Sequence, residues 1–551
     1  MRKMIALLAI VAICVSAKGQ MILGENHAMM RLEKGKKFLL LPVQEKQEYA
    51  ALTVVNADNE VTERFNIRLA VDKIDYFVPL TLPANGTLLD VMFHGDRRTT
   101  GAIRDFVCWH EMKYSDAFDM TNRERFRPLY HHTPRYGWMN DPNGMFYKDG
   151  VWHLFYQWNP YGSQWENMTW GHSTSRDLLH WEAQPTAIKS DALGSIFSGS
   201  CIVNGNDVVA FYTSAGASQT QSMAISTDNG ITFKKYSGNP ILTSDQPDFR
   251  DPKVFWNEDA KLWNMILAVG QEMRIYSSLD LKEWKYESAF GQEYGNHGGV
   301  WECPDLMKMD GGKWVLLCNI NPGGPFGGSA TQYFVGTFDG HRFTCESMPK
   351  VTKWLDYGKD HYATVTFYNA PEKRHVALAW MSNWQYANEV PTHQYRSANS
   401  IPRDLGLFTN GEETYVSVVP SPEMLAMRGK TTKQLTEACE VVVTLKGTTD
   451  ITLSNAKGDK VVMHYDAQGQ TFSMDRTKSG EVAFSEAFPC TTVAPTHGQI
   501  RQLRLFIDRC SIEAFDAEGR MAMTNLVFPS TPYTSIHTTN KAKVVIYDLR
   551  K

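Results

Sequence analysis

A repeat of about fifty residues most constrains what this chain can fold into. Segments with a serine or threonine, an aspartate two residues later and an aromatic residue shortly after it recur along the middle of the chain. They begin at Ser175, Ser226, Ser278 and Thr337, which are 51, 52 and 59 residues apart. Turn residues and short alternating apolar runs surround each segment, which predicts strands. A period of this length made of strands and turns indicates a β-propeller with one blade per repeat.

A second repeat, out of phase with the first, places an acidic residue before each of three strand–turn–strand units. Asp141 and Asp251 are 110 residues apart, about two periods, and Glu302 follows 51 residues later. With the strand pair around 362–380, counting from Asp141 gives five blades by about residue 405. Equivalent positions at blade starts gather around the central axis of a propeller. We therefore expect three carboxylates to converge on one cavity.

Buried acids that lie close together repel one another and lose hydration, so such a cluster favours a functional site. By contrast, Asp177 and Asp280 of the first repeat are expected to cap turns. Two facing carboxylates suit retaining glycoside hydrolysis, one as nucleophile and one as acid/base. Calcium is the competing interpretation, but it prefers many oxygens from one local loop, and these acids come from distant segments.

Other reaction classes find no support in the sequence. There is no GxSxG elbow, no HExxH helix, no phosphate-binding loop and no metal-ligand spacing of Cys or His. We therefore expect no cofactor and no metal. Two alternatives of other classes remain: a non-catalytic glycan-binding propeller and a structural propeller held by calcium.

The amino terminus predicts export. A basic head at Arg2 and Lys3 precedes an apolar run over 5–15, which is too short to span a bilayer, and small residues follow near Gly19. This pattern is typical of a secretory signal peptide over 1–19, cleaved near Gly19/Gln20. No later stretch is apolar enough to cross a membrane, and periplasmic and secreted locations both fit.

Composition agrees with a soluble exported protein. The 551 residues include 56 Lys and Arg against 60 Asp and Glu, with no basic stripe, which argues against a nucleic-acid partner. Aromatic residues make up 12% and suit either a β-rich core or carbohydrate binding. Eight cysteines beyond Cys14 are scattered. We expect most of them to be buried, with one or two disulfides left open.

The chain as a whole predicts an all-β fold in several parts. Alternating runs at 49–55 and 64–71 predict a small β-domain over 20–124. The propeller is expected over 125–410 and a linker over 411–430. Alternating strands at 441–453 and 500–515 predict a β-sandwich over 431–551.

Three motifs around the repeated acids carry a resemblance to a known family. Trp138-Met-Asn-Asp-Pro-Asn-Gly144, Arg250-Asp-Pro252 and Glu302-Cys-Pro-Asp305 resemble the boxes of glycoside hydrolase family 32, the β-fructosidases. Further segments, including those at 155–157, 170–172, 197–200 and 403–405, resemble family segments in the same order. The resemblance runs from about residue 127 to the carboxyl terminus. It implies a five-bladed propeller followed by a β-sandwich.

The resemblance also implies roles for individual residues. Asp141 takes the position of the nucleophile, Glu302 that of the acid/base, and Asp251 that of the transition-state stabiliser. Glu302 must stay protonated near neutral pH while Asp141 stays ionised, which burial beside other carboxylates can achieve. Positions near those that line the family's fructose pocket are Asn140, Gln157, Trp165, Phe197, Ser198, Arg250, Tyr362 and Trp380.

The expected activity is that of an exported, retaining fructanase that releases terminal β-D-fructose from levan or inulin, with sucrose as a further substrate. An endo-levanase, an invertase and a fructosyltransferase of the same family are the alternatives. The extra amino-terminal domain is similar to that of some bacterial exported fructanases. It would bind polysaccharide, shape the pocket rim or only pack against the propeller.

Overall fold

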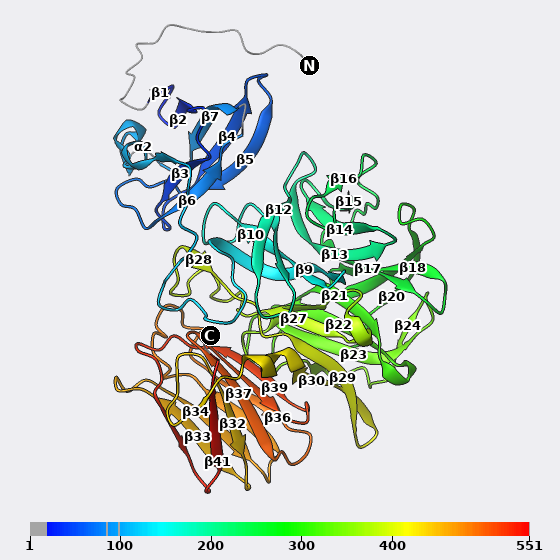
Figure 1. Ribbon diagram of the computed structural model, residues 1–551. Helices are drawn as coiled ribbons and strands as arrows, with labels where there is room; N and C mark the ends of the chain where they lie inside the picture. The colour runs from blue at the N-terminus through cyan, green and yellow to red at the C-terminus, as the bar shows by residue number, and fades with distance from the viewer. Residues whose placement is uncertain (1–18, 84–85, 97–99, 550–551) are drawn as a thin grey trace. The chain divides into compact units, whose positions relative to one another are not determined.

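The computed structural model describes residues 19–83, 86–96 and 100–549 (Figure 1). The expected signal peptide lies outside these residues apart from Gly19. The chain divides into two compact units: one holds the residues up to 122 together with 159–167, and the other holds 123–158 and 168–551. The protein is all-β, with 50% strand and 4% helix. Within the described ranges, no helix combines the length and the apolar character needed to cross a membrane.

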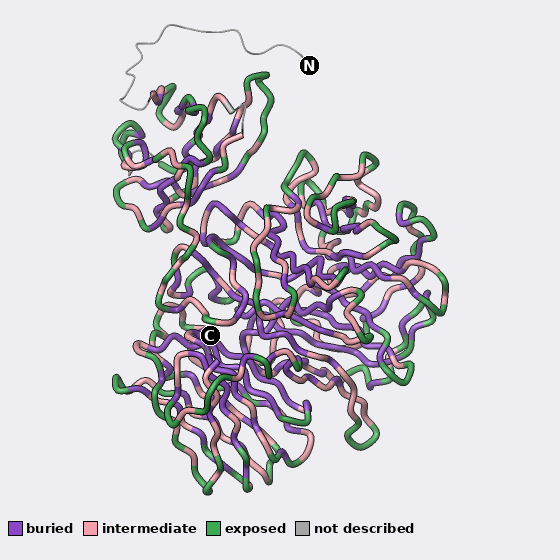
Figure 2. The backbone as a smooth tube through the Cα atoms, viewed as in Figure 1, coloured by how far each residue is buried: buried purple, intermediate pink, exposed green. Residues whose placement is uncertain are grey.

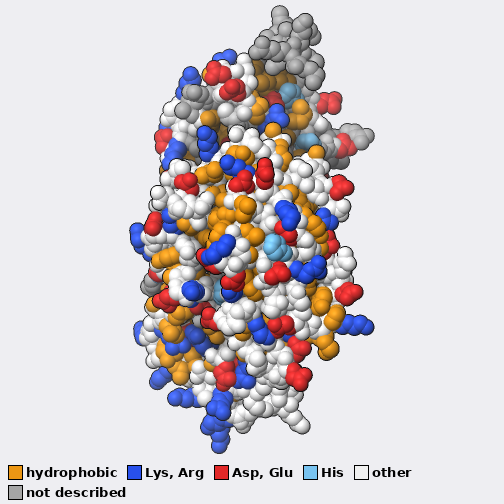
Figure 3. Space-filling view, turned by 90° about the vertical axis from the view of Figure 1, so that its right-hand side faces the viewer, with side chains coloured by type: hydrophobic (Ala, Val, Ile, Leu, Met, Phe, Trp, Pro, Cys, Tyr) orange, Lys and Arg blue, Asp and Glu red, His pale blue; other side chains and the backbone are white. Residues whose placement is uncertain are grey.

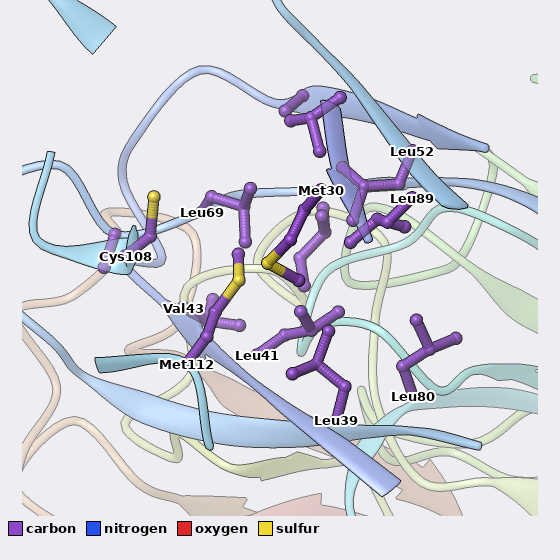
Figure 4. Close-up of a cluster of buried hydrophobic side chains, with 14 of the residues drawn as sticks. Met30, Leu39, Leu41, Val43, Leu52, Leu69, Leu80, Leu89, Cys108 and Met112 are labelled. Atoms are coloured by element: carbon purple, nitrogen blue, oxygen red, sulfur yellow. The ribbon is translucent and has the colours of Figure 1, made fainter. Parts of the chain in front are cut away.

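The amino-terminal unit contains two antiparallel sheets around one apolar core. The larger sheet has the order β1-β2-β7-β4-β5 and the smaller one β6-β3-β8. Leu39, Leu41, Leu52 and Leu89, which come from three different strands, point into this core (Figure 4). The elements are β1 (Gln20–Ile22), β2 (His27–Arg31), β3 (Phe38–Val43), β4 (Ala50–Asn56), β5 (Val61–Ile67), β6 (Tyr76–Thr81), β7 (Gly86–Phe93), η1 (Ile103–Asp105), α2 (Cys108–Glu111) and β8 (Lys113–Ser115).

Five sheets, numbered I to V here, follow one another between residues 137 and 420. Sheet I has β9 (Gly137–Lys148), β10 (Val151–Asn159), β11 (Thr169–Ser175) and β12 (Glu182–Ile188). Sheet II has β13 (Ser195–Asn204), β14 (Asp207–Ala215), β15 (Gln219–Ser226) and β16 (Lys234–Lys235). Sheet III has β17 (Phe249–Asn257), β18 (Leu262–Val269), β19 (Glu272–Ser278) and β20 (Lys285–Phe290). Sheet IV has β21 (Val300–Lys308), β22 (Trp314–Asn321), β23 (Ala330–Phe338), β24 (Phe343–Cys345) and β25 (Lys353–Trp354); sheet V has β26 (Tyr362–Thr366), β27 (Val376–Trp380), β29 (Arg403–Asn410) and β30 (Glu413–Pro420). Short 3-10 turns η2 (Asp310–Gly312) and η3 (Pro371–Lys373) lie between strands.

The first strands of the five sheets lie next to one another in a closed series. Strands β9, β13, β17, β21 and β26 contact their neighbours in turn, and β26 contacts β9. Strand β28 (Tyr395–Arg396), late in the chain, also pairs with β9 in parallel and so joins sheet I to the end of the series. These first strands are largely buried (Figure 2), and so is the connection 355–361 between sheets IV and V.

The repeated Ser-x-Asp segments are turns, as expected. The Asp177 carboxylate accepts bonds from the backbone N–H groups of Leu179 and His180, at 3.0 and 2.8 Å. Asp280 accepts the equivalent pair, both at 2.9 Å. Aspartate satisfies the free backbone donors of a tight turn, so the first repeat is structural.

Two further sheets form the carboxyl-terminal part of the chain and enclose a second large core. One has the order β31-β41-β32-β37-β38-β39 and the other β36-β35-β34-β33-β40. The elements are η4 (Pro422–Met427), β31 (Thr431–Thr432), β32 (Cys439–Thr444), β33 (Thr449–Ser454), β34 (Lys460–Asp466), β35 (Thr471–Asp475), β36 (Thr491–Pro495), β37 (Gln502–Asp508), β38 (Ser511–Asp516), β39 (Ala522–Leu526), β40 (Ser535–Thr538) and β41 (Lys543–Asp548).

The structure differs from the expected linker over 411–430. Residues 413–420 form β30, which pairs with β29 across the turn Asn410-Gly411-Glu412. An Asn-Gly pair between alternating strands is a strong hairpin signal, and it extends sheet V into the expected linker. All eight cysteines between 108 and 510 are free, so none of these forms one of the disulfides that the sequence left open. Charges of both signs are interspersed on the face drawn in Figure 3.

Candidate active site

Three carboxylates from the first strands of sheets I, III and IV lie close enough to interact through their charges. Asp141 lies on β9, Asp251 on β17 and Glu302 on β21. Cys303 connects two of them: its backbone N–H donates to Asp251 Oδ2 at 2.8 Å, and its Sγ lies 3.6 Å from Asp141 Oδ2. The convergence expected from the second repeat is therefore present.

A β-bulge interrupts the first strand at the point where each of four sheets contributes to the site. The register shifts fall at 196–199 in β13, 250–253 in β17, 302–305 in β21 and 362–365 in β26. Asp251, Cys303 and Ala363 have positive φ values of 65°, 41° and 54° there. A bulge adds one residue to one strand and re-aims its side chains. The repeated bulge thus directs several functional groups toward the same space.

Asp141 is surrounded by hydrogen-bond donors. Asn140 Nδ2 donates to its Oδ1 at 2.9 Å, and Ser198 Oγ donates to its Oδ2 at 2.7 Å. Asn140 is oriented in turn by Trp138 Nε1, which donates to its Oδ1 at 2.8 Å. Burial and the nearby Glu302 raise the pKa of Asp141, and these donors oppose that rise.

Asp251 is 5% exposed and its backbone N–H donates to Thr213 Oγ1 at 3.0 Å. Burial is the largest cause that raises its pKa, to about 7. Glu302 and Asp141 add to the rise, while Arg250 opposes it. The ionised forms of Asp141 and Asp251 are thus disfavoured, which a purely structural position would avoid.

Glu302 is held by one cation and one hydroxyl. Arg250 donates through Nε and Nη2 to Glu302 Oε1, at 3.2 and 3.1 Å, and the Tyr362 hydroxyl donates to Oε2. Arg250 is itself fixed by Asp248 Oδ1 at 2.7 Å and Gln219 Oε1 at 3.2 Å. This arrangement fixes the carboxyl group from two sides and leaves its side chain 21% exposed.

Two buried side chains that the sequence assigned to the pocket keep polar atoms without partners among the described residues. Both amide atoms of Gln157 on β10 and the Nε1 of Trp380 on β27 are buried and make no hydrogen bond with the described residues. An unpaired buried amide is unfavourable unless a ligand or water satisfies it. These atoms are therefore suited to the hydroxyl groups of a bound sugar.

Two further expected residues have different surroundings. Phe197 packs against the core cluster that contains Trp138 and Tyr362, and its carbonyl accepts a bond from Trp170 Nε1 at 3.0 Å. Trp165 lies on the segment 159–167, which belongs to the amino-terminal unit, and is 44% exposed. It is therefore the one expected pocket residue that lies in the other unit.

Sequence reasoning missed two residues of the site. Cys303 was grouped with the buried apolar cysteines, although its position inside the Glu302-Cys-Pro motif was a usable signal. Trp384 was not singled out; its ring lies 5.8 Å from Trp138 and 4.7 Å from Trp380, centroid to centroid. Among the described residues no group of three or more His, Cys, Asp or Glu side chains is arranged to hold a metal ion.

Comparison with known families covers nearly the whole described chain. Residues 131–420 match the glycosyl hydrolases family 32 N-terminal domain, and residues 409–550 match the family 32 C-terminal domain. The chain belongs to glycoside hydrolase family 32. Residues 24–130 match a domain of unknown function, DUF4980.

Relatives of this glycoside hydrolase agree with that assignment. A levanase of Bacillus subtilis is 42% identical over 453 residues, which cover 74% of this chain and 67% of the levanase. An extracellular exo-inulinase of Aspergillus niger is 36% identical and is covered over 90% of its length, against 74% of this chain. The crystal structure of exo-inulinase from Aspergillus awamori superposes with a TM-score of 0.71 at 33% identity, covering 77% of this chain and 98% of that one.

The family membership has direct consequences for fold and activity. The protein is a glycoside hydrolase, and its fold is a β-propeller followed by a β-sandwich. Its substrates belong to the fructan and sucrose class.

Proposed function

We propose that this family 32 enzyme is an exported, retaining β-fructosidase that releases terminal β-D-fructose from fructans. Levan and inulin are the proposed polymers, and sucrose is a further substrate. The observation that carries the proposal is the pair formed by Asp141, surrounded by neutral donors, and Glu302, held between Arg250 and Tyr362. The levanase and exo-inulinase names of the relatives support the same substrate class.

In this mechanism Asp141 is the nucleophile. Its carboxylate attacks the anomeric carbon of the fructosyl unit and forms a covalent intermediate. Asn140 and Ser198 donate to its two oxygens and so orient it in one position. Oriented donors also favour the ionised form that attack requires.

Glu302 acts as the acid/base. It protonates the leaving glycosidic oxygen and then removes a proton from the water that releases fructose. Arg250 and Tyr362 fix the carboxyl group that performs both steps. Asp251 stabilises the transition state. Burial, and after it the nearby Glu302 and Asp141, raise its pKa to about 7, and a positive sugar ring would favour its ionised form.

The remaining substrate contacts come from neutral groups. We assign the Gln157 amide and the Trp380 indole N–H to fructose hydroxyls because both lack protein partners. Trp165 and Phe197 supply apolar surface to the sugar.

The proposed architecture has five blades, formed by sheets I to V, with a sandwich over 431–551. The amino-terminal β-domain spans 20–124 and the propeller begins near residue 125. Residues 1–19 are the proposed signal peptide, which agrees with the extracellular location named for the exo-inulinases.

The product profile on levan, inulin and sucrose, followed over time by chromatography, tests this function. Fructose as the sole early product from the polymers is the expected result, and relative rates identify the preferred linkage. A ladder of oligosaccharides would instead assign an endo-acting enzyme, and longer fructosides from sucrose a transferase. No turnover of any of the three would overturn the β-fructosidase proposal.

A further inference from the structure

Regular strand pairing resumes after the bulges of sheets III and IV at two oppositely charged residues. In β17 the pairing stops at Arg250 and resumes at Lys253, two residues after Asp251. In β21 it stops at Glu302 and resumes at Asp305. The extra residue of a bulge is left unpaired, so the residues at its ends determine where the bulged segment lies. The two charged residues therefore stand where they can fix the acidic segments of the site.

Lys253 and Asp305 form one buried ion pair. Lys253 Nζ lies 2.9 Å from Asp305 Oδ2, and the two side chains are 9% and 1% exposed. Displacement of either charge would leave the other one buried without its partner, which is strongly unfavourable. The pair therefore tolerates little movement of β17 relative to β21.

Thr366 connects sheet V to the same pair. Its backbone N–H and its hydroxyl both donate to Asp305 Oδ2, at 2.6 and 2.7 Å, and its carbonyl accepts from Lys253 Nζ at 3.1 Å. Thr366 lies on β26, four residues after Tyr362, whose hydroxyl donates to Glu302. The first strands of three sheets thus meet at one carboxylate oxygen.

The ion pair and the site border the same small space. A cavity of about 10 Å³ is lined by Ser198, Asp251 and Cys303, which belong to the site, and also by Lys253 and Thr366. A cavity of this size has room for about one water molecule. Protein interiors are closely packed and transmit strain, so a displacement of the pair would reach the site residues.

We propose that Lys253, Asp305 and Thr366, called the bulge clamp here, are positioning residues for the reaction. The clamp holds the bulges of sheets III, IV and V in one arrangement and so fixes the acid/base relative to the transition-state stabiliser. The inference rests on the proposed function, which assigns those two roles. It gives Asp305, the last residue of the third sequence motif, a role that requires no contact with the sugar.

Two threonine-to-valine variants form a matched test. Thr366→Val removes a hydroxyl bond to the buried Asp305 and keeps the backbone N–H bond. Thr524→Val does the same at the buried Asp356, where the hydroxyl and the N–H donate at 2.7 and 2.8 Å. The Thr524 hydroxyl also accepts from Arg403, so this control should lose at least as much stability. On sucrose we expect Thr366→Val to lower kcat about three- to tenfold with KM changed by less than about twofold, and Thr524→Val to leave both unchanged.

Substitution of the lysine should have a larger effect. Lys253→Met leaves Asp305 buried without its cation, and kcat should fall about 100-fold, the loss expected when a catalytic group is displaced by about 1 Å. Lys353→Met is the control. Lys353 is also buried, and its Nζ bonds the Glu413 carboxylate and the Thr414 carbonyl at 2.7 Å each, both outside the strands of the site. This variant should lower the melting temperature and keep kcat within about twofold.

A double variant tests whether the clamp acts as one unit. If Lys253 and Thr366 both act through Asp305, the combination of Lys253→Met with Thr366→Val should lower kcat no further than Lys253→Met alone. Hydrogen exchange of Thr366→Val should be faster than that of the wild type in β17, β21 and β26 and unchanged in the strands of residues 431–551.

The opposite results overturn the inference. A kcat of Lys253→Met within about twofold of the wild type would show that the pair does not position the site. Equal losses of kcat in the clamp variants and their controls would mean that activity only follows stability, and a rise in KM without a loss of kcat would mean that the clamp serves binding instead. If Lys253→Met does not fold, the two threonine variants decide. Absence of turnover of sucrose, levan and inulin by the wild-type enzyme is a separate outcome, which would refute the proposed function itself.

Discussion

The larger unit holds two clusters of charged side chains. Both contain aspartate and glutamate, but the pKa values of their acids shift in opposite directions. The site cluster consists of Asp141, Asp251 and Glu302. The junction cluster connects sheet V to the sandwich and consists of Asp356, Arg403, Glu513, His131 and Asp508. Arg403 bonds both Asp356, at 2.7 Å, and Glu513. His131 lies between Asp508, at 2.8 Å, and Glu513, at 2.7 Å.

The pKa directions of the acids differ between the clusters. Burial raises the pKa of Asp356, but His361 and Arg403 outweigh it and the pKa falls to about 2. Burial likewise opposes ionisation of Glu513, yet Arg403 and His131 lower its pKa. Burial lowers the pKa of His131, but bonds to Asp508 and Glu513 raise it to about 9, so this imidazole is charged at neutral pH. In the site cluster the pKa of Asp251 rises to about 7.

The number of cations next to the acids explains why their pKa values shift in opposite directions. Two cations, Arg403 and His131, serve the three acids of the junction cluster. In the site cluster one cation, Arg250, serves Glu302 and Asp251 and is shared with Asp248. The junction acids are at most 3% exposed, whereas the Glu302 side chain is 21% exposed, so the smaller number of cations, and not deeper burial, leaves the charge of the site unbalanced. We therefore expect the junction cluster to stabilise the fold and the site cluster to lower stability, a cost that the proposed catalytic role would explain.

The largest expected effect is on activity. Asp141→Asn removes the proposed nucleophile, so kcat should fall by at least about 10⁴-fold, while the melting temperature stays equal or rises because a crowded charge is lost. Initial rates on sucrose and a thermal melt measure both quantities. Asp177→Asn, which weakens a turn far along the chain from the site motifs, is the control and should keep kcat within about twofold. Retention of more than a few per cent of activity by Asp141→Asn would contradict the assignment.

Removal of a charge from the junction cluster should instead lower the stability of the fold. Arg403→Met leaves Asp356 and Glu513 buried with fewer cations, so the free energy of unfolding should fall by about 3–5 kcal/mol. Urea unfolding at pH 7 measures this loss. Arg374→Met is the control, since Arg374 pairs with Asp404 and Glu423 in a less buried setting, and it should cost about 1 kcal/mol. Equal losses for the two variants would remove the distinction between the clusters.

A pH-dependent stabilisation tests the site cluster directly. The pKa of Asp251 in the folded protein, about 7, lies above the ordinary value of an unfolded aspartate. Between about pH 4 and 7 the native state therefore binds more protons than the unfolded state. The free energy of unfolding consequently falls as pH rises through that window. Asp251→Asn removes this penalty. The variant should be more stable than the wild type by about 2–4 kcal/mol at pH 8, and the difference should vanish near pH 4. A destabilised variant at pH 8 would show that the charge is already compensated.

The sequence predicted the site cluster because the acids stand at equivalent places of a repeat. Asp141, Asp251 and Glu302 each open a strand–turn–strand unit, and the periodicity brings them together. The turn role of Asp177 and Asp280 was also predictable, because a serine and a tight turn determine it locally. The first feature depends on a repeat along the chain and the second on a short-range pattern.

Long-range contacts were not predictable in the same way. His131 and Glu513 are 382 residues apart in the chain, and neither belongs to a local motif that indicates the other. The same holds for Tyr161, whose pattern in the sequence is that of a loop and whose ring completes the core of a different unit. Such pairings depend on how whole sheets dock, which strand periodicity alone does not determine.

The smallest expected effect concerns the ionisation of Asp141. Ser198 donates to this carboxylate and lowers its pKa, so Ser198→Ala should raise the pKa further. The ionised nucleophile is then lost at a higher pH, and the acidic limb of the kcat/KM profile should move upward by about one pH unit. Ser200→Ala is the control, because Ser200 Oγ bonds the Pro252 carbonyl and the Val254 N–H rather than the carboxylate. If the acidic limb of the kcat/KM profile does not move in Ser198→Ala, or moves equally in both variants, the Ser198 hydroxyl does not control the charge of Asp141.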